Sequence, residues 1–419
     1  MENYGFIRVA ACSPRVKVAD IDYNTSEILS AIDTAEEKKV SLLVFPELCV
    51  TGYTCGDLFA QDLLISEAEK AVVKIKTYTR AKEVTVVVGV PVRHLDRLYN
   101  CAAVIRNGMV RGLVPKIYVP NYGEFYESRW FSSGADFLSP GNVSTGNFHD
   151  DGKDYYREGT PCTMKYAGFR TTISPNQIFS IGDSSFAVEI CEDLWMPVPP
   201  SSFHALSGAR ILVNTSASNE ILMKHEYRRS LVANQSARTI SGYIYCSCSY
   251  GESTQDLVFA GSSMICENGA FLAESERFST STQMILADID MEKLSILRQR
   301  ETTFSAIIPD GRKSSDMRRR YSMVDLGKAA STSFEDELFR HVEPHPFVPG
   351  GDPAEIDRRA KEITSIQVMG LMTRLEHIGC KTAVIGISGG LDSTLALLVT
   401  VMAFDRLGWD RKGIIGITM

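Results

Sequence analysis

The sequence predicts an α/β protein with two domains, a helix–sheet–sheet–helix sandwich followed by the start of a parallel α/β domain. Three observations lead to this class. Short apolar runs alternate with helical patterns from residue 1 to about 290. Asn-Gly pairs at Asn107 and Asn268 separate apolar runs and predict tight hairpins. From about residue 350, a helix, a strand, a helix and a strand follow in order.

The first domain is expected to span residues 1–290. Its strands are short apolar runs, expected at 6–11, 41–45, 84–90, 99–106, 109–114, 186–191, 211–214, 243–247, 262–266 and 284–289. A helix is expected over 24–37, where apolar residues recur at helical spacing. Residues 137–177 are rich in Gly, Ser, Thr and Asp without a clear period, and we expect a long surface insertion there.

Residues 291–349 read as a solvated linker, or alternatively as a strap that contacts a neighbouring subunit. The second domain is expected over 350–419, with helices at 354–378 and 392–407 and strands at 382–387 and 413–418. The strand at 382–387 should be buried. This βαβ order implies a parallel sheet. One such unit cannot cover both faces of a parallel sheet, so we expect this domain to be incomplete in the chain.

Composition narrows the possible partners and compartment. The chain has 419 residues and a formal net charge of −7, which argues against a general nucleic-acid binder. Its ten cysteines lie mostly in apolar runs, as expected of reduced thiols in the cytoplasm. No apolar stretch is long enough to cross a bilayer, so we expect no membrane partner.

Three polar residues stand at the ends of predicted strands: Glu47, Lys116 and Cys191. A nearby cation favours the thiolate of a cysteine, which is the nucleophilic form. A sheltered glutamate can take the thiol proton and later activate a water. The lysine and a backbone N–H can hold an oxyanion. Such a set would hydrolyse an amide through a thioester, although each residue alone is more often structural or solvated.

The segments around these residues are Phe45-Pro46-Glu47-Leu48, Pro115-Lys116 and Ile190-Cys191-Glu192-Asp193-Leu194-Trp195. In this order they resemble the three signatures of the nitrilase superfamily. The resemblance implies a nitrilase-like α-β-β-α sandwich in which Glu47 is the general base, Lys116 the transition-state cation and Cys191 the nucleophile. The backbone N–H of Glu192 would complete the oxyanion hole. The family's second acidic residue would be Glu127, with Glu124 as the competitor.

A second motif follows the strand expected at 382–387. Ser388-Gly389-Gly390-Leu391-Asp392-Ser393 lets the backbone approach a phosphate closely and leads into the N-terminus of a helix. No lysine follows the glycines, so this is not a Walker A loop. It resembles the pyrophosphate-gripping loop of N-type ATP pyrophosphatases. The resemblance implies a Rossmann-like domain of the adenine nucleotide α hydrolase type, with ATP held by Ser388, Gly389, Gly390, Asp392 and Ser393, and Mg²⁺ held by Asp392.

The two motifs together resemble the glutamine-dependent NAD⁺ synthetases. The resemblance implies that the first domain hydrolyses glutamine. The second would adenylate deamido-NAD⁺ with Mg-ATP, so that ammonia arriving through an internal tunnel displaces AMP and gives NAD⁺, AMP and pyrophosphate. It also implies a homo-oligomer. The glutamine contacts implied are Tyr122, Phe125, Glu192, Ser218 and Lys224.

Two other interpretations stay open on the sequence. A nitrilase-type amidase can be fused to a different adenylating module, which would not bind deamido-NAD⁺. A non-catalytic assembly piece would bind no glutamine, and its Cys191 would be no more reactive than its other thiols.

Overall fold

The computed structural model describes residues 4–138, 144–145, 155–156, 162–253, 255–304, 320–333, 336–348 and 350–418. The chain forms two compact units, residues 1–340 and 341–419. Within the described ranges, no helix combines the length and the apolar character needed to cross a bilayer.

The first unit contains two large sheets. The six-stranded sheet has the order β16-β1-β2-β3-β4-β5. Its strands in chain order are β1 (Phe6–Ser13), β2 (Leu42–Val44), β3 (Thr85–His94), β4 (Arg97–Arg106), β5 (Met109–Pro115) and β16 (Gln283–Asp290). β1, β2 and β3 are parallel to one another, and the other pairs are antiparallel.

The seven-stranded sheet has the order β15-β14-β13-β12-β11-β10-β17. Its strands are β10 (Gln177–Ile181), β11 (Ser184–Ile190), β12 (Ile211–Ser216), β13 (Gly242–Ser247), β14 (Met264–Glu267), β15 (Ala270–Glu274) and β17 (Ser322–Asp325). β11, β12 and β13 are parallel, so their carboxyl ends meet at one edge. That edge carries the Cys191 turn.

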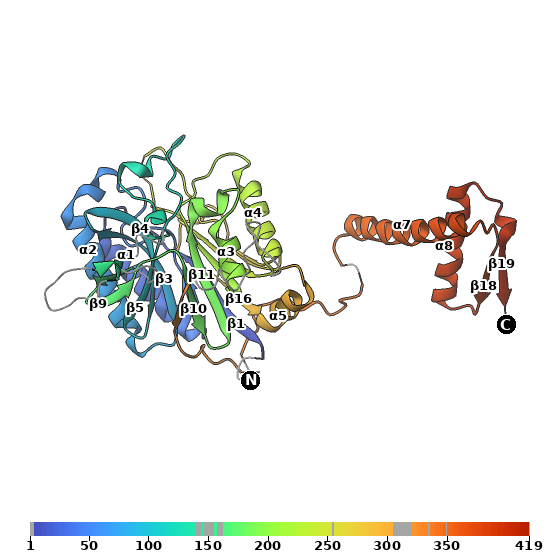
Figure 1. The fold of residues 1–419 in the computed structure, drawn as a ribbon, viewed down its shortest axis with the longest axis horizontal. Helices are drawn as coiled ribbons and strands as arrows, with labels where there is room; N and C mark the ends of the chain where they lie inside the picture. The colour runs from blue at the N-terminus through green and yellow to red at the C-terminus, as the bar shows by residue number, and fades with distance from the viewer. Residues whose placement is uncertain are drawn as a thin grey trace. The chain divides into compact units, whose positions relative to one another are not determined.

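Helices cover the outer face of each sheet (Figure 1). α1 (Ile21–Glu37) and α2 (Asp62–Tyr78) share an apolar core with the six-stranded sheet. α3 (Pro200–Leu206) and α4 (Lys224–Arg238) lie on the seven-stranded sheet, and Ala205 and Val232 are among their buried residues. α5 (Met291–Arg300) follows β16. The predicted helix–sheet–sheet–helix order is therefore confirmed.

Strand alternation explains this layering. Along β3, Val86 and Val88 belong to the core that faces the helices, while Val87 belongs to the core between the two sheets. Successive strand residues point to opposite faces of a sheet. A strand that is apolar at every position must therefore be covered on both sides, and β3 is fully buried over Thr85–Val92.

Both predicted hairpins are present. Asn107 and Gly108 join β4 to β5 with φ angles of 51° and 75°, and Asn268 and Gly269 join β14 to β15 with 46° and 86°. Two successive positive φ values define a turn whose twist matches the flanking strands. Asn tolerates this conformation better than most residues and Gly has no Cβ to clash, so the Asn-Gly pairs were reliable signals.

The expected surface insertion at 137–177 needs a correction. Residues 162–177 include a hairpin of β8 (Thr163–Tyr166) and β9 (Phe169–Thr172) and contribute Tyr166 and Ile173 to the helix-facing core. The strands are four residues each, too short to show a period in the sequence. Also within this segment, β6 (Ser144–Thr145) pairs with β7 (Tyr155–Tyr156). Residues 139–143, 146–154 and 157–161 of the expected insertion lie outside the described ranges.

The segment expected to be a linker, 291–349, also differs from the prediction. It supplies α5 and β17, and β17 pairs with the edge strand β10. Arg340 forms an ion pair with Glu267, and the compact first unit runs to Arg340. β17 alternates half-buried and exposed residues, so it lacks the apolar run that marks a strand in sequence. Residues 305–319, 334–335 and 349 lie outside the described ranges.

The second unit contains α7 (Pro353–Ile378), β18 (Ala383–Ile387), α8 (Leu391–Leu407) and β19 (Ile414–Thr418). β18 and β19 pair in parallel, which confirms the predicted βαβ unit. β18 was expected to be buried, but Val384 on this strand is 61% exposed. α7 and α8 pack on each other through Val368, Val399 and Ala403, and α8 packs against β18. Only the side chains of β18 that face α8 are therefore shielded.

Candidate active site

Glu47 lies in a turn that directly follows β2 and is fully buried. The next residue, Leu48, has a φ of 50°. The turn packs against Gly89 of β3, where a Cβ would come within 2.1 Å of the Leu48 nitrogen. Glu47 Oε1 accepts hydrogen bonds from Lys116 Nζ at 2.7 Å and Asn100 Nδ2 at 2.6 Å. Its Oε2 accepts one from the backbone N–H of Ala217 at 2.9 Å.

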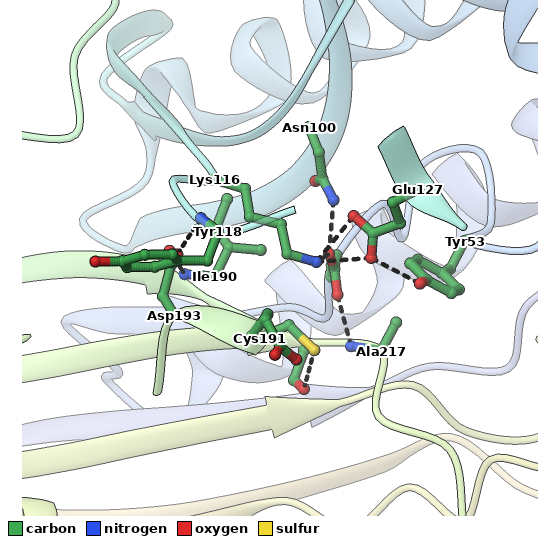
Figure 2. Close-up of polar contacts among 12 residues, drawn as sticks. Tyr53, Asn100, Lys116, Tyr118, Glu127, Ile190, Cys191, Asp193 and Ala217 are labelled. Carbon is green, nitrogen blue, oxygen red and sulfur yellow. Dashed lines mark hydrogen bonds and ion pairs between the residues drawn. The ribbon is translucent and has the colours of Figure 1, made fainter. Parts of the chain in front are cut away.

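Lys116 follows β5, and its side chain is fully buried between two carboxylates. Its Nζ lies 2.7 Å from Glu47 Oε1 and 2.7 and 3.0 Å from the two carboxylate oxygens of Glu127 (Figure 2). Burial alone would lower the pKa of the Lys116 ammonium, but the charges of Glu127 and Glu47 outweigh it and hold that pKa well above its ordinary value. Lys116 is therefore a fixed cation.

Glu127, and not Glu124, is the second carboxylate in contact with Lys116. Glu127 also accepts a hydrogen bond from the Tyr53 hydroxyl at 2.7 Å. Burial raises the pKa of the Glu127 carboxyl to about 7, against the opposing charge of Lys116. Glu124 instead accepts a hydrogen bond from Asn219 at 2.7 Å. The geometry thus favours Glu127 for the auxiliary position, as the sequence predicted.

Cys191 begins the 3₁₀ turn η5 (Cys191–Trp195), directly after β11, with a φ of 44°. A non-glycine residue in this region is strained, and the surrounding contacts must hold it. Asn214 does so from the neighbouring strand β12. Its Oδ1 accepts from the Cys191 N–H at 3.1 Å, and its Nδ2 donates to the Cys191 carbonyl at 3.4 Å.

Asp193 fixes the remainder of this turn. Its two carboxylate oxygens accept from the backbone N–H groups of Ile190 and Tyr118, each at 2.9 Å (Figure 2). Tyr118 lies two residues after Lys116, so this buried carboxyl connects the cysteine turn to the lysine loop. Burial raises the pKa of Asp193 to about 8.

The Cys191 thiol is buried near the negative charge of Glu47 and the positive charge of Lys116. Burial and, to a smaller extent, the charge of Glu47 raise the pKa of the thiol to about 12, against the lowering effect of Lys116. The thiol therefore holds its proton at neutral pH in the absence of a substrate. A base within reach must remove that proton as the sulfur attacks, and the Glu47 carboxylate is suited to this role.

The predicted glutamine contacts form two groups of interactions. The Tyr122 hydroxyl donates to Glu192 Oε1 at 2.7 Å. Lys224 Nζ lies 5.4 Å from the ring centre of Phe125 and donates to Asn219 Oδ1 at 2.5 Å. Burial raises the pKa of Glu192 and lowers that of Lys224. Both groups can therefore respond to the charges of an incoming ligand.

The fifth predicted contact, Ser218, lies just after β12 and is buried. Its Oγ accepts a hydrogen bond from Arg228 Nη2 at 3.3 Å. Arg228 is fully buried and also pairs with Glu220 at 2.7 Å. Ser218 therefore adjoins a buried cation as well as the candidate site.

Sequence reasoning missed several residues that hold the catalytic set. Asn100 bonds Glu47, Asn214 holds the Cys191 turn, and Tyr53 bonds Glu127. A signal was available for the two asparagines, because each is a buried polar residue within an apolar strand and such residues need a partner. Tyr53 gave no comparable signal, since tyrosine is common in ordinary cores.

The predicted phosphate loop connects β18 to α8 in the second unit. Gly389 has a φ of 81°, and Gly390 is the residue that caps α8. Ser393 Oγ lies 3.3 Å from Ser388 Oγ and 3.1 Å from the Gly390 carbonyl; Ser388 is exposed and Ser393 is partly exposed. Asp392 stands in the first turn of α8. The loop thus presents hydroxyls and a helix N-terminus to solvent, where an anion can bind.

Comparisons with known proteins agree with this arrangement. Residues 8–299 match the model of the carbon-nitrogen hydrolase family. The glutamine-dependent NAD(+) synthetase of Mycobacterium bovis is 36% identical over all of this chain, which spans 58% of that relative. The chain therefore covers little more than half the length of such relatives.

Two solved structures of glutamine-dependent NAD(+) synthetases share the fold. The enzyme from Cytophaga hutchinsonii gives a TM-score of 0.57 at 22% identity, covering 96% of this chain and 52% of that one. The enzyme from Acinetobacter baumannii, solved with adenosine diphosphate, gives a TM-score of 0.52 at 20% identity. That match covers 99% of this chain and 59% of the solved chain. Together with the family match, these likenesses confirm the predicted nitrilase-like sandwich.

Proposed function

This chain belongs to the carbon-nitrogen hydrolase family, and from that premise we propose that its first domain hydrolyses the side-chain amide of glutamine through a thioester on Cys191. The observation that carries the proposal is the buried set of Glu47, Lys116 and Glu127 whose charges act on the thiol of a strained turn. A merely structural cysteine would need neither the strain nor a buried lysine.

In the first step the Cys191 sulfur attacks the amide carbon while its proton passes to Glu47. The new C–S bond gives a tetrahedral intermediate with a negatively charged oxygen. Glu47 then gives its proton to the leaving nitrogen, the C–N bond breaks, and ammonia departs. The γ-glutamyl group stays on Cys191 as a thioester.

The oxyanion needs donors that are not already engaged. The N–H of Cys191 is committed to Asn214. The first N–H groups of a helix lack acceptors within the helix, which leaves that of Glu192, the second residue of η5, as the backbone donor. The Lys116 ammonium is the second donor, because its two carboxylate partners can be served by two of its three N–H groups. The free N–H expected at the start of η5 supports the oxyanion role that the family resemblance implies for the Glu192 backbone.

In the second step Glu47 removes a proton from a water that attacks the thioester carbon. A second tetrahedral intermediate collapses, the C–S bond breaks and glutamate leaves. The proton held by Glu47 returns to the Cys191 sulfur. The role of Lys116 is unchanged, because charge develops on the same oxygen in both steps.

For the substrate, the charged groups near the site fit an amino acid. Glu192 suits the α-ammonium group and Lys224 the α-carboxylate, with Tyr122, Phe125 and Ser218 as further contacts. The partly buried positions of Glu192 and Lys224 support this assignment, since their shifted pKa values favour binding of a complementary charge.

We propose that the second unit belongs to a synthetase domain that binds ATP at 388–393. The resemblance of that loop and the curated relatives support adenylation of the nicotinate carboxylate of deamido-NAD(+), with release of pyrophosphate. Ammonia would then displace AMP and give NAD(+). The described residues include no cluster of three metal-binding side chains. A lone Asp392 still fits Mg²⁺, which is often held by one carboxylate plus substrate phosphates and would neutralise phosphate charge.

The cellular location and the oligomeric state of this protein remain proposals. None of the ten cysteines, all of which lie in the described ranges, forms a disulfide bond, which supports the cytoplasmic location that their pattern predicted. A homo-oligomer remains a prediction from the family resemblance.

The proposed function is tested by replacing the nucleophile. Cys191→Ala should abolish ammonia release from glutamine while leaving the melting temperature close to that of the parent. Cys266→Ala, a buried thiol on β14, is the matched control and should remain active. A glutamine-mimicking diazo-ketone should modify Cys191 alone, as read by peptide mass mapping. Undiminished ammonia release by Cys191→Ala would refute the mechanism.

A further inference from the structure

A chain of buried polar side chains leads away from Cys191 on a path that the mechanism above does not use. Ser216 Oγ donates to Cys191 Sγ at 3.2 Å. The Tyr245 hydroxyl lies 2.6 Å from the same Ser216 oxygen. Ser216 ends β12 and Tyr245 lies on the adjacent strand β13, and neither side chain reaches solvent.

A buried cation lies beside this chain. The charge of Arg228 acts on the Tyr245 hydroxyl and lowers its pKa, against the larger effect of burial. Arg228, on α4, donates from Nη2 to Ser218 Oγ at 3.3 Å. The Arg228 side chain is fully buried and is oriented by its ion pair with Glu220.

The groups at the two ends, the Arg228 guanidinium and the Cys191 sulfur, decide which atoms donate and which accept. A guanidinium can only donate, so Ser218 accepts from Arg228, and the positive charge of Arg228 favours the oxygen end of the Tyr245 hydroxyl. Tyr245 can then donate to Ser216, and Ser216 donates to the sulfur. The Tyr245 and Ser216 hydroxyls then both donate towards the cysteine, and two hydrogen bonds aligned in this way polarise one another.

We propose that Ser216 is a further catalytic residue, which stabilises the Cys191 thiolate as a donor, and that Tyr245 is a positioning residue, which orients and polarises the Ser216 hydroxyl in a relay to the sulfur. The proposal rests on the proposed role of Cys191 as nucleophile. No proton is transferred along the relay, since the thiol proton goes to Glu47.

The other side of the site shows why such a donor is needed. Lys116 is shared between Glu47 and Glu127, so much of its charge is already compensated. Burial and the charge of Glu47 both oppose ionisation of the thiol. A neutral hydroxyl that points at the sulfur stabilises negative charge there without adding a net charge near Glu47.

The test measures how fast iodoacetamide alkylates Cys191, because only the thiolate reacts. The rate is followed from pH 7 to 9 by mass spectrometry of the Cys191 peptide, which separates it from the other thiols. The measurement does not depend on glutamine. A parent protein that is alkylated but releases no ammonia from glutamine would overturn the proposed function and leave the relay standing.

We expect Ser216→Ala to lower the alkylation rate by roughly tenfold at each pH, because loss of a donor to a charged group raises the thiol pKa by about one unit. Tyr245→Phe should lower it by roughly threefold, since it weakens the remaining donor without removing it. The double variant should match Ser216→Ala, because Tyr245 acts only through Ser216.

Thr215→Val is the matched control. Thr215 is buried beside Ser216, and its hydroxyl has no hydrogen-bond partner among the described residues. Its alkylation rate should equal that of the parent. The relay is refuted if Ser216→Ala reacts as fast as Thr215→Val, or if Tyr245→Phe slows the reaction as much in the Ser216→Ala background as in the parent. The second comparison uses ratios of rates, so a general loss of packing would not imitate the expected result.

Discussion

Replacing Glu127 by glutamine tests the assignment of the auxiliary carboxylate. The amide keeps the shape of the side chain but removes the charge that Lys116 meets at 2.7 and 3.0 Å. In a buried site, a hydrogen bond between charged groups is stronger than one to a neutral group, so we expect the substitution to cost about 2 kcal/mol of interaction energy with Lys116. At 1.36 kcal/mol per factor of ten, kcat should fall about 30-fold if that loss appears in the transition state.

The assay is ammonia release from glutamine, with active sites titrated by the diazo-ketone. KM should change little, because Glu127 contacts Lys116 and Tyr53 and none of the proposed glutamine contacts. Glu124→Gln is the matched control. Its contact with Asn219 is partly exposed, so kcat should change by less than about threefold. If Glu127→Gln kept its full kcat and Glu124→Gln were inactive, the auxiliary carboxylate would be Glu124 and not Glu127.

Three further variants test other parts of the structure. Gly89→Ala would place a Cβ 2.1 Å from the Leu48 nitrogen, so we expect a stability loss of about 3 kcal/mol or more and a fall in kcat. Gly386→Ala is the control, because open space surrounds Gly386, and it should change neither the melting temperature nor ammonia release. Burial raises the pKa of Glu252 in the folded protein to about 7, above that of an unfolded glutamate. The protonated Glu252 therefore stabilises the fold fully below the unfolded pKa, and this stabilisation is lost as pH rises towards 7. Glu252→Gln should therefore show a melting temperature that falls less steeply than the parent's between pH 4.5 and 7, and an equal slope would contradict this. Asp392→Asn should weaken Mg-ATP binding roughly tenfold by calorimetry while ammonia release stays unchanged.

Much of the fold was readable because its signals are local. The Asn-Gly turns, the alternating strands and the helix over 353–378 each depend on residues close together in sequence. The elements that were misjudged, β8, β9 and β17, have four residues each and partly polar faces. Such strands owe their form to the sheet or core they join rather than to their own pattern.

The sequence by itself determined which residues carry the candidate chemistry, because Glu47, Lys116 and Cys191 each follow an apolar strand and match a family pattern. Only the tertiary structure decided what surrounds them. It placed Glu127 rather than Glu124 on Lys116, put Asn214 across the cysteine turn, and brought Ser216 and Tyr245 to the sulfur. These are hydrogen bonds between buried groups on different elements. No local periodicity encodes them, since each partner is selected by the need to satisfy a polar group that folding has removed from water.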